Sequence, residues 1–142
     1  MAQGQPTRDP QKSLPVIFRA MLLGQILFFG IALFLYVSKK FPAGLQHLDK
    51  PLQVTVVVLS FICIYVGIII FRKKMQTLAE VKDESEKWKI LTSAHLIRWA
   101  LIEGPVLFCI ICFFLVGNLS FAALAGTLII FFGLQAPVTK LY

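Results

Sequence analysis

Glu103 is the one acidic residue inside the long apolar runs of this sequence. A carboxyl group is costly to hold in hydrocarbon, so a chain that keeps one there usually gives it a partner or a task. A carboxyl that gains and loses a proton inside a membrane can relay protons or exchange a cation. Two interpretations of Glu103 are open: a carboxylate that pairs with a neighbouring side chain and fixes the helices, or an ion site.

Polar and aromatic side chains near Glu103 share one side of a helix. At 100° per residue, and with His95 set at zero, Arg98 falls at about 300°, Trp99 at about 40° and Glu103 at about 80°. Together they occupy an arc of about 140°. We expect this face to point into a bundle of helices, because lipid offers polar groups no hydrogen-bond partner.

The expected depths of these residues suggest a contact with an earlier run. Counting back from Val116 puts Arg98 about 27 Å away, near the inner boundary of a bilayer, and Glu103 about 7 to 8 Å deeper than Arg98. In the first apolar run, Arg19 is expected near the same boundary and Gln25 about 9 Å deeper. We therefore predict that Gln25 faces Glu103, with Arg19 or Arg98 reaching towards the carboxylate.

Gly104 and Pro105 directly follow Glu103. Proline has no backbone N–H, so the carbonyl of Leu101 loses its helical donor. We expect a kink at this point, which would open space beside the carboxyl group.

Other chemistry is weakly represented in the sequence. It contains no nucleophile–base pair, no Gly-rich phosphate loop and no metal-ligand cluster, so we expect no enzyme activity, cofactor or metal. Cys63, Cys109 and Cys112 all lie in apolar runs. Cys109 and Cys112 have the spacing of a redox pair, but no charge or histidine accompanies them, and we interpret them as small hydrophobic residues.

The composition indicates which elements must position these residues. The chain has 142 residues, 58% of them hydrophobic, and a mean hydropathy of +0.80. Soluble domains are only about half apolar, so part of the solvent must be lipid. Four runs, at about 14–37, 52–71, 91–116 and 119–136, approach the roughly 20 residues of a membrane-spanning helix. We predict an all-α polytopic membrane protein, with four transmembrane helices arranged as two antiparallel hairpins within residues 13–142.

Local signals mark the ends of these runs. Residues 1–12 are polar with two prolines, which predicts a disordered tail. Ser13 predicts the N-cap of the first helix, and Asp83 that of the third. Gly117 and Asn118 predict a tight turn before the fourth helix.

The charge distribution predicts an orientation. The formal net charge is +7, and Lys and Arg accumulate in the cytoplasmic loops of membrane proteins. With four spans, only Lys39, Lys40 and Lys50 lie on the side away from the termini. The other side holds Arg8, Lys12, Arg19, Arg72, Lys73, Lys74, Lys82, Lys87, Lys89, Arg98 and Lys140. We predict that both termini are cytoplasmic, and assign the basic residues to anionic lipid rather than to nucleic acid.

Small residues line one side of the fourth run. Ala122, Gly126 and Gly133 let a neighbouring helix approach closely. This stripe favours a small membrane protein that acts by association, as an accessory subunit or homo-oligomer. The alternative function is proton or cation translocation centred on Glu103.

Part of the third run resembles a known family of ion-carrying helices. The segment Ala100–Leu115 places Glu103-Gly104 after an Ala/Leu-rich stretch and before an apolar Leu and Phe run. It resembles the carboxylate-bearing helix of rotary ATPase proteolipid (c-type) subunits. The resemblance implies that Glu103 would bind the transported proton or sodium ion.

The whole chain has a second resemblance. Its features are Gly24-Gln25, Ile97-Arg98, Glu103-Gly104-Pro105 with Phe108, Gly117-Asn118 and Pro137. In these it is similar to a group of small, uncharacterised four-helix membrane proteins of Bacteroidota. That resemblance implies a multi-pass protein of a bacterial inner (plasma) membrane, and no particular activity.

Overall fold

The structure is a computed structural model that describes residues 10–40 and 44–137. It contains helix α1 (Pro10–Val37), a short 3-10 helix η1 (Gln46–Leu48), and helices α2 (Asp49–Glu80), α3 (Glu84–Val116) and α4 (Leu119–Gly133). No strand occurs within these two ranges. The predicted all-α fold, with four helices in the expected order, is confirmed.

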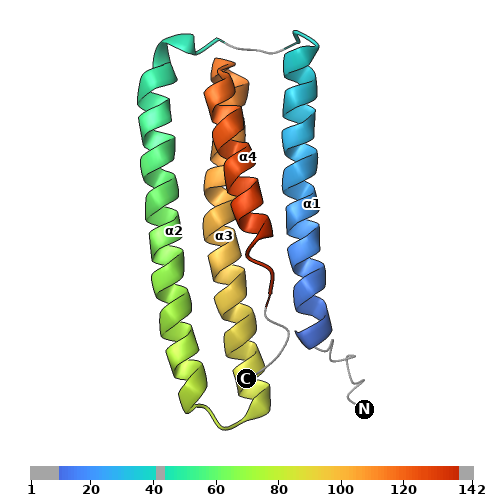
Figure 1. Ribbon diagram of the computed structural model, residues 1–142, viewed down its shortest axis with the longest axis vertical. Coiled ribbons are helices and arrows are strands. Elements are labelled where there is room, and N and C mark those ends of the chain that lie inside the picture. The colour runs from blue at the N-terminus through green and yellow to red at the C-terminus, as the bar shows by residue number, and fades with distance from the viewer. Residues whose placement is uncertain (1–9, 41–43, 138–142) are drawn as a thin grey trace, which may run out of the picture.

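α1, α3 and α2 stand side by side, and α4 lies against both α3 and α1 (Figure 1). α3 lies in the middle, with α2 on one side, α1 on the other, and α4 along its upper half. α3 packs against all three other helices, and α4 also packs against α1. Although α1 and α2 follow one another in the chain, they lie on opposite sides of α3. The antiparallel pairs that pack are therefore α2–α3, α3–α4 and α1–α4.

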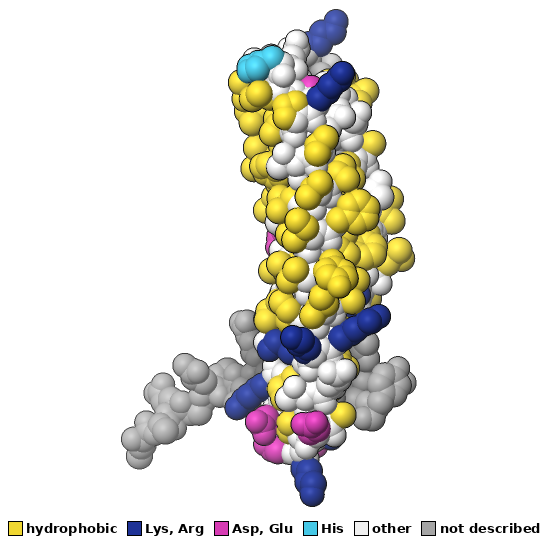
Figure 2. Space-filling view, turned by 90° about the vertical axis from the view of Figure 1, so that its left-hand side faces the viewer, with side chains coloured by type: hydrophobic (Ala, Val, Ile, Leu, Met, Phe, Trp, Pro, Cys, Tyr) yellow, Lys and Arg dark blue, Asp and Glu magenta, His cyan; other side chains and the backbone are white. Residues whose placement is uncertain are grey.

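The exterior is that of a helical membrane protein. α1, α2 and α3 are each long and apolar enough to cross a membrane. Large hydrophobic side chains are exposed along α1 and α2, among them Leu27, Phe34 and Phe61. Figure 2 shows this apolar belt giving way to Lys and Arg side chains, and then to acidic ones, at one end of the molecule. Soluble monomers rarely expose continuous apolar surface on this scale.

The helix ends follow local signals, with one exception. The Asp83 carboxylate accepts a hydrogen bond from the backbone N–H of Ser85 at 3.4 Å and caps α3, as predicted. Gly117 ends α3 with a φ of 74°, a left-handed conformation that glycine adopts without steric cost. The predicted N-cap at Ser13 is wrong, because α1 already begins at Pro10. The rest of the predicted tail, residues 1–9, lies outside the described residues.

α4 is shorter than the sequence suggested. It ends at Gly133, and residues 134–137 follow without helix, whereas the prediction ran to Ala136. Pro137 accounts for the difference, because the residue before a proline is disfavoured in the helical conformation. The 15 residues of α4 rise only about 22 Å, less than the roughly 30 Å of hydrocarbon in a bilayer.

Candidate functional site

Five rings from all four helices meet towards the end of the molecule at which α2 and α3 are connected. We call Phe18, Phe71, His95, Trp99 and Phe132 the aromatic cluster. The ring centroid of Phe18 lies 5.0 Å from that of Trp99 and 5.2 Å from that of Phe132. The His95 ring lies 5.2 Å from Phe71 and 5.3 Å from Trp99. These contacts fix the relative heights of the helices, and so the positions of the polar residues on α3.

Trp99 also holds the chain after α4. Its indole Nε1 donates to the backbone carbonyl of Gln135 at 3.1 Å. Irregular backbone at membrane depth is tolerated where the protein itself supplies the hydrogen bond. Sequence reasoning placed Trp99 on the inward face but missed Phe18, Phe71, Phe132 and Gln135, because nothing in their own segments sets them apart from lipid-facing residues.

His95 is the most enclosed ionisable side chain of this region. It is only 1% exposed, and neither ring nitrogen has a hydrogen-bond partner in the structure. Its contacts are with the rings of the aromatic cluster. A buried polar group without a partner costs about 1–3 kcal/mol, so His95 is a candidate for a role other than packing.

The predicted contact between Gln25, Glu103 and an arginine does not form. Gln25 is 1% exposed, and neither end of its amide has a hydrogen-bond partner among the described residues. Arg19 is exposed. Arg98 places its guanidinium carbon 4.7 Å from the centroid of the Phe71 ring on α2, a cation–π contact. Glu103 is half-buried, and in the described parts of the chain no hydrogen bond or ion pair reaches its carboxylate.

Helix geometry explains why this prediction was wrong. Arg98 and Glu103 are five residues apart, which is about 140° around α3, so their side chains leave the helix on different flanks. Arg98 turns towards α2. On α1, Gln25 lies seven residues beyond Phe18, which packs on Trp99. Gln25 is therefore level with a point three residues beyond Glu103, an offset of about 4–5 Å.

The hydroxyl groups within the apolar helices separate into two kinds. Thr55, Ser60 and Thr127 each donate to the backbone carbonyl four residues earlier, at 2.8, 2.7 and 2.9 Å. Tyr65 is 68% exposed, and its ring is too long to bond in this way to its own helix. Tyr65 and Glu103 are thus polar groups at the surface of the apolar region to which the described residues offer no hydrogen bond.

Tyr65 and Glu103 lie at about the same depth. A Cβ placed on Gly67 of α2 would lie 3.6 Å from Cδ1 of Leu101 on α3, so these two residues are level. Tyr65 precedes Gly67 by two residues, and Glu103 follows Leu101 by two residues. Because α2 and α3 are antiparallel, both steps lead towards the same end of the molecule, so Tyr65 and Glu103 are level.

The segment after Glu103 stays helical. α3 continues through Pro105, which is buried, to Val116. Gly104 is exposed, and a Cβ there would meet nothing within 4 Å. There is accordingly open space next to Glu103 on the surface of α3, while the kink stays a prediction.

The small residues of α4 face α1 of the same chain. A Cβ on Gly126 would lie 3.8 Å from the Phe29 ring, and one on Gly133 would lie 4.0 Å from Leu22. Ala122 is buried in the core. The predicted packing stripe therefore lies against a helix of its own chain.

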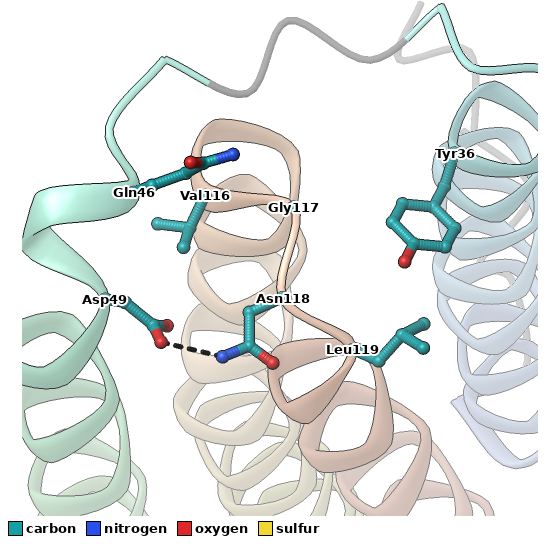
Figure 3. A pocket seen from close by; sticks show the side chains of 7 residues that line it. All are labelled: Tyr36, Gln46, Asp49, Val116, Gly117, Asn118 and Leu119. Carbon is teal, nitrogen blue, oxygen red and sulfur yellow. Dashed lines mark hydrogen bonds between the residues drawn. The ribbon is translucent and has the colours of Figure 1, made fainter.

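A hollow of about 420 Å³ lies at the opposite end of the molecule (Figure 3). We call it the outer hollow. It is lined by Tyr36, Gln46, Asp49, Val116, Gly117, Asn118 and Leu119.

Asp49 ties the two connections at this end together. Asn118 Nδ2 donates to Asp49 Oδ2 at 2.8 Å, and Gln53 Nε2 donates to Asp49 Oδ1 at 3.2 Å. Asn118 also caps α4 through its own side-chain oxygen. Both oxygens of Asp49 are used, so this carboxylate fixes the loops. The sequence alone did not indicate this link, because Asp49 and Asn118 are 69 positions apart.

The remaining site expectations concern metals and cysteines. Within the described residues, no group of three or more His, Cys, Asp and Glu side chains could hold a metal ion. Cys109 and Cys112 are buried free thiols in the hydrophobic core. Comparisons with protein-family models, with curated proteins and with solved structures found no match to this chain.

Proposed function

We propose that this chain is a small integral membrane protein that acts as an accessory or oligomerising helical subunit. The observation that carries the proposal is the outer face of α2. This 32-residue helix packs mainly against α3, and it buries only Val56, Ser60 and Gly67. Most of its surface is free to pack against another transmembrane helix.

Tyr65 supports this assignment. It lies on the side of α2 opposite Gly67, at the depth of Glu103, with most of its surface exposed. Hydrocarbon gives its hydroxyl no partner, whereas a polar side chain on a second helix would. Such interhelical hydrogen bonds are worth about 0.6–2 kcal/mol in membranes, enough to bias which helices associate.

The stripe of small residues on α4 is not the surface for this association. Gly126 and Gly133 already pack on Phe29 and Leu22 of α1. The outer face of α2, and not the small-residue stripe of α4 that the sequence suggested, is therefore the proposed surface for association.

We infer further that the protein lies in a bacterial inner membrane with both termini in the cytoplasm. The support is the grouping of Arg72, Lys73 and Lys74 below the apolar belt, on the side predicted to be cytoplasmic. The route of the chain after α4 also supports four crossings. Gln135 reaches the level of Trp99, and extended residues cover more length than helical ones, about 3.3 against 1.5 Å each.

Cysteine crosslinking in native membranes tests the proposed interface. Val58→Cys is placed on the outer face of α2, in a chain that also carries Cys63→Ala. Leu27→Cys, on the outward side of α1, is the matched control. We expect oxidation to give a covalent dimer of the α2 variant and little of the α1 variant, and blue-native gels to show a discrete assembly. A strict monomer, or equal crosslinking of both variants, would contradict an α2 interface.

The second candidate function is translocation of a proton or cation by Glu103. The observation that favours it is that no described residue pairs with this carboxylate, because the structural alternative required a partner for it. The local resemblance to proteolipid subunits points to the same residue.

Ion flux in liposomes tests this candidate. The wild-type chain is expected to dissipate an imposed proton or sodium gradient, and Glu103→Gln is expected to lose this flux while folding normally. The control is Glu80→Gln, an exposed acid at the end of α2. Equal flux in the wild-type chain and Glu103→Gln, or none in either, removes translocation from consideration and leaves association untouched.

A further inference from the structure

A hollow of about 490 Å³ lies on the surface of α3, close to its N-terminal end. We call it the inner hollow, because it lies on the side predicted to be cytoplasmic. It is lined by Trp88, Lys89, Thr92, Ser93, Leu96 and Ile97. Neither the association of α2 nor the carboxylate of Glu103 uses it.

The lining changes in character along the helix. Trp88 and Lys89 lie at the end farthest from the membrane, Thr92 and Ser93 in the middle, and Leu96 at the end nearest the membrane. From Trp88 to Ile97 the helix rises about 13–14 Å. Since Arg98 is expected at the hydrocarbon boundary, Ser93 to Leu96 lie about 3–8 Å beyond it, within a headgroup layer that is about 5–8 Å thick, and Trp88 and Lys89 lie on the aqueous side of that layer.

Hydrogen-bond donors and positive charge collect at its polar part. Lys89 lines the hollow, and Lys74 of α2 lies beside it, where its Nζ donates to Oγ of the lining residue Ser93 at 3.0 Å. None of the lining residues is acidic. This arrangement is complementary to an anion that carries an apolar extension.

We propose that the inner hollow binds one anionic phospholipid. The phosphate lies against Lys74 and Lys89, and the glycerol and first acyl carbons lie along Leu96 and Ile97. Lysine near a membrane surface attracts anionic lipid by about 1 kcal/mol per residue, and an apolar wall at headgroup depth favours the lipid over a free anion.

Native mass spectrometry of the full chain in neutral detergent tests the site. The probes are dioleoylphosphatidylglycerol and dioleoylphosphatidylcholine, which share acyl chains and differ in headgroup charge. We expect the first to bind the wild-type chain on the order of tenfold more tightly. The double variant Lys74→Gln/Lys89→Gln is expected to lose this preference.

The matched control is Lys73→Gln/Lys82→Gln. It removes the same charge from two exposed lysines that do not line the hollow, and it is expected to keep the preference. Three results would overturn the proposal. These are equal binding of the two lipids by the wild-type chain, equal losses in the two double variants, and displacement of the lipid by millimolar inorganic phosphate. The last result would reassign the hollow to a free anion.

Discussion

Gln25, His95, Glu103 and Tyr65 carry polar groups that the apolar helices do not satisfy from within. Threonine and serine are short enough to bond to the preceding turn of their own helix, as Thr55, Ser60 and Thr127 do. Longer side chains depend on a partner from elsewhere. Gln25 and His95 are sealed in the interior, whereas Tyr65 faces outwards. The Tyr65 hydroxyl can gain a hydrogen-bond partner when the protein associates with another helix. The side chains of Gln25 and His95 can gain one only if the packing inside the bundle changes.

Gln25→Met tests whether the buried amide of Gln25 only lowers the stability of the fold. Methionine has a similar volume and no strong polar group, so it removes the unsatisfied amide without leaving a cavity. We expect the free energy of unfolding to rise by about 1–2 kcal/mol, seen as a higher melting temperature in mild detergent. Gln25→Ala is the comparison and is expected to lower stability through the cavity it leaves. A lower melting temperature for Gln25→Met would mean that the amide has a partner in the working protein.

At the scale of helices, α3 is the element on which the fold depends. It supplies much of the core and touches the other three helices. α1 joins through α3 and through the small residues of α4, whereas α2 joins almost entirely through α3. The small residues shorten the distance between α1 and α4. α1 and α4 should therefore separate when one of these glycines is enlarged.

Gly126→Leu is expected to destabilise the protein by about 1–3 kcal/mol, because the added side chain overlaps the Phe29 ring. Gly126→Ala should be tolerated, since its Cβ would make ordinary contact with that ring and alanine favours the helix. The control is Gly30→Leu, whose side chain would extend into open space from α1. Thermal unfolding in detergent compares the three variants. Equal effects of leucine at positions 126 and 30 would show that α1 and α4 are not tightly packed there.

At the scale of the whole molecule, the apolar belt and the charged ends define an axis across the membrane. Basic side chains lie mainly at one end, beyond the apolar part of α2 and α3 (Figure 2). The other end carries the outer hollow and the link between Asp49 and Asn118. The charge difference predicts which end stays in the cytoplasm.

Labelling of single cysteines in whole cells tests that orientation. Lys39→Cys, next to the end of α1, is expected to react with a membrane-impermeant maleimide added outside. Lys82→Cys, between α2 and α3, should react only after the cells are opened. The native cysteines lie within the predicted spans and serve as an internal blank. Labelling of Lys82→Cys in intact cells would reverse the predicted topology.

The helices and several of their ends follow from the amino-acid sequence alone. A chain in lipid must satisfy its backbone within each segment, so an apolar run of sufficient length has to be helical. Caps and turns such as Asp83 and Gly117-Asn118 depend on neighbouring residues only, and they were predicted correctly. The ends of α1 and α4 were less certain, because helices can extend or stop by a few residues with little change in hydrophobicity.

Which side chains meet depends on how the helices pack against one another. It put α3 between α1 and α2, offset Gln25 from Glu103, and turned Arg98 onto Phe71. It placed the glycines of α4 against α1 and joined Asp49 to Asn118 across 69 positions. Each of these outcomes depends on the rotation and height of one helix relative to another. Those quantities are set by the packing of many side chains together, and the periodicity of a single apolar segment does not contain them.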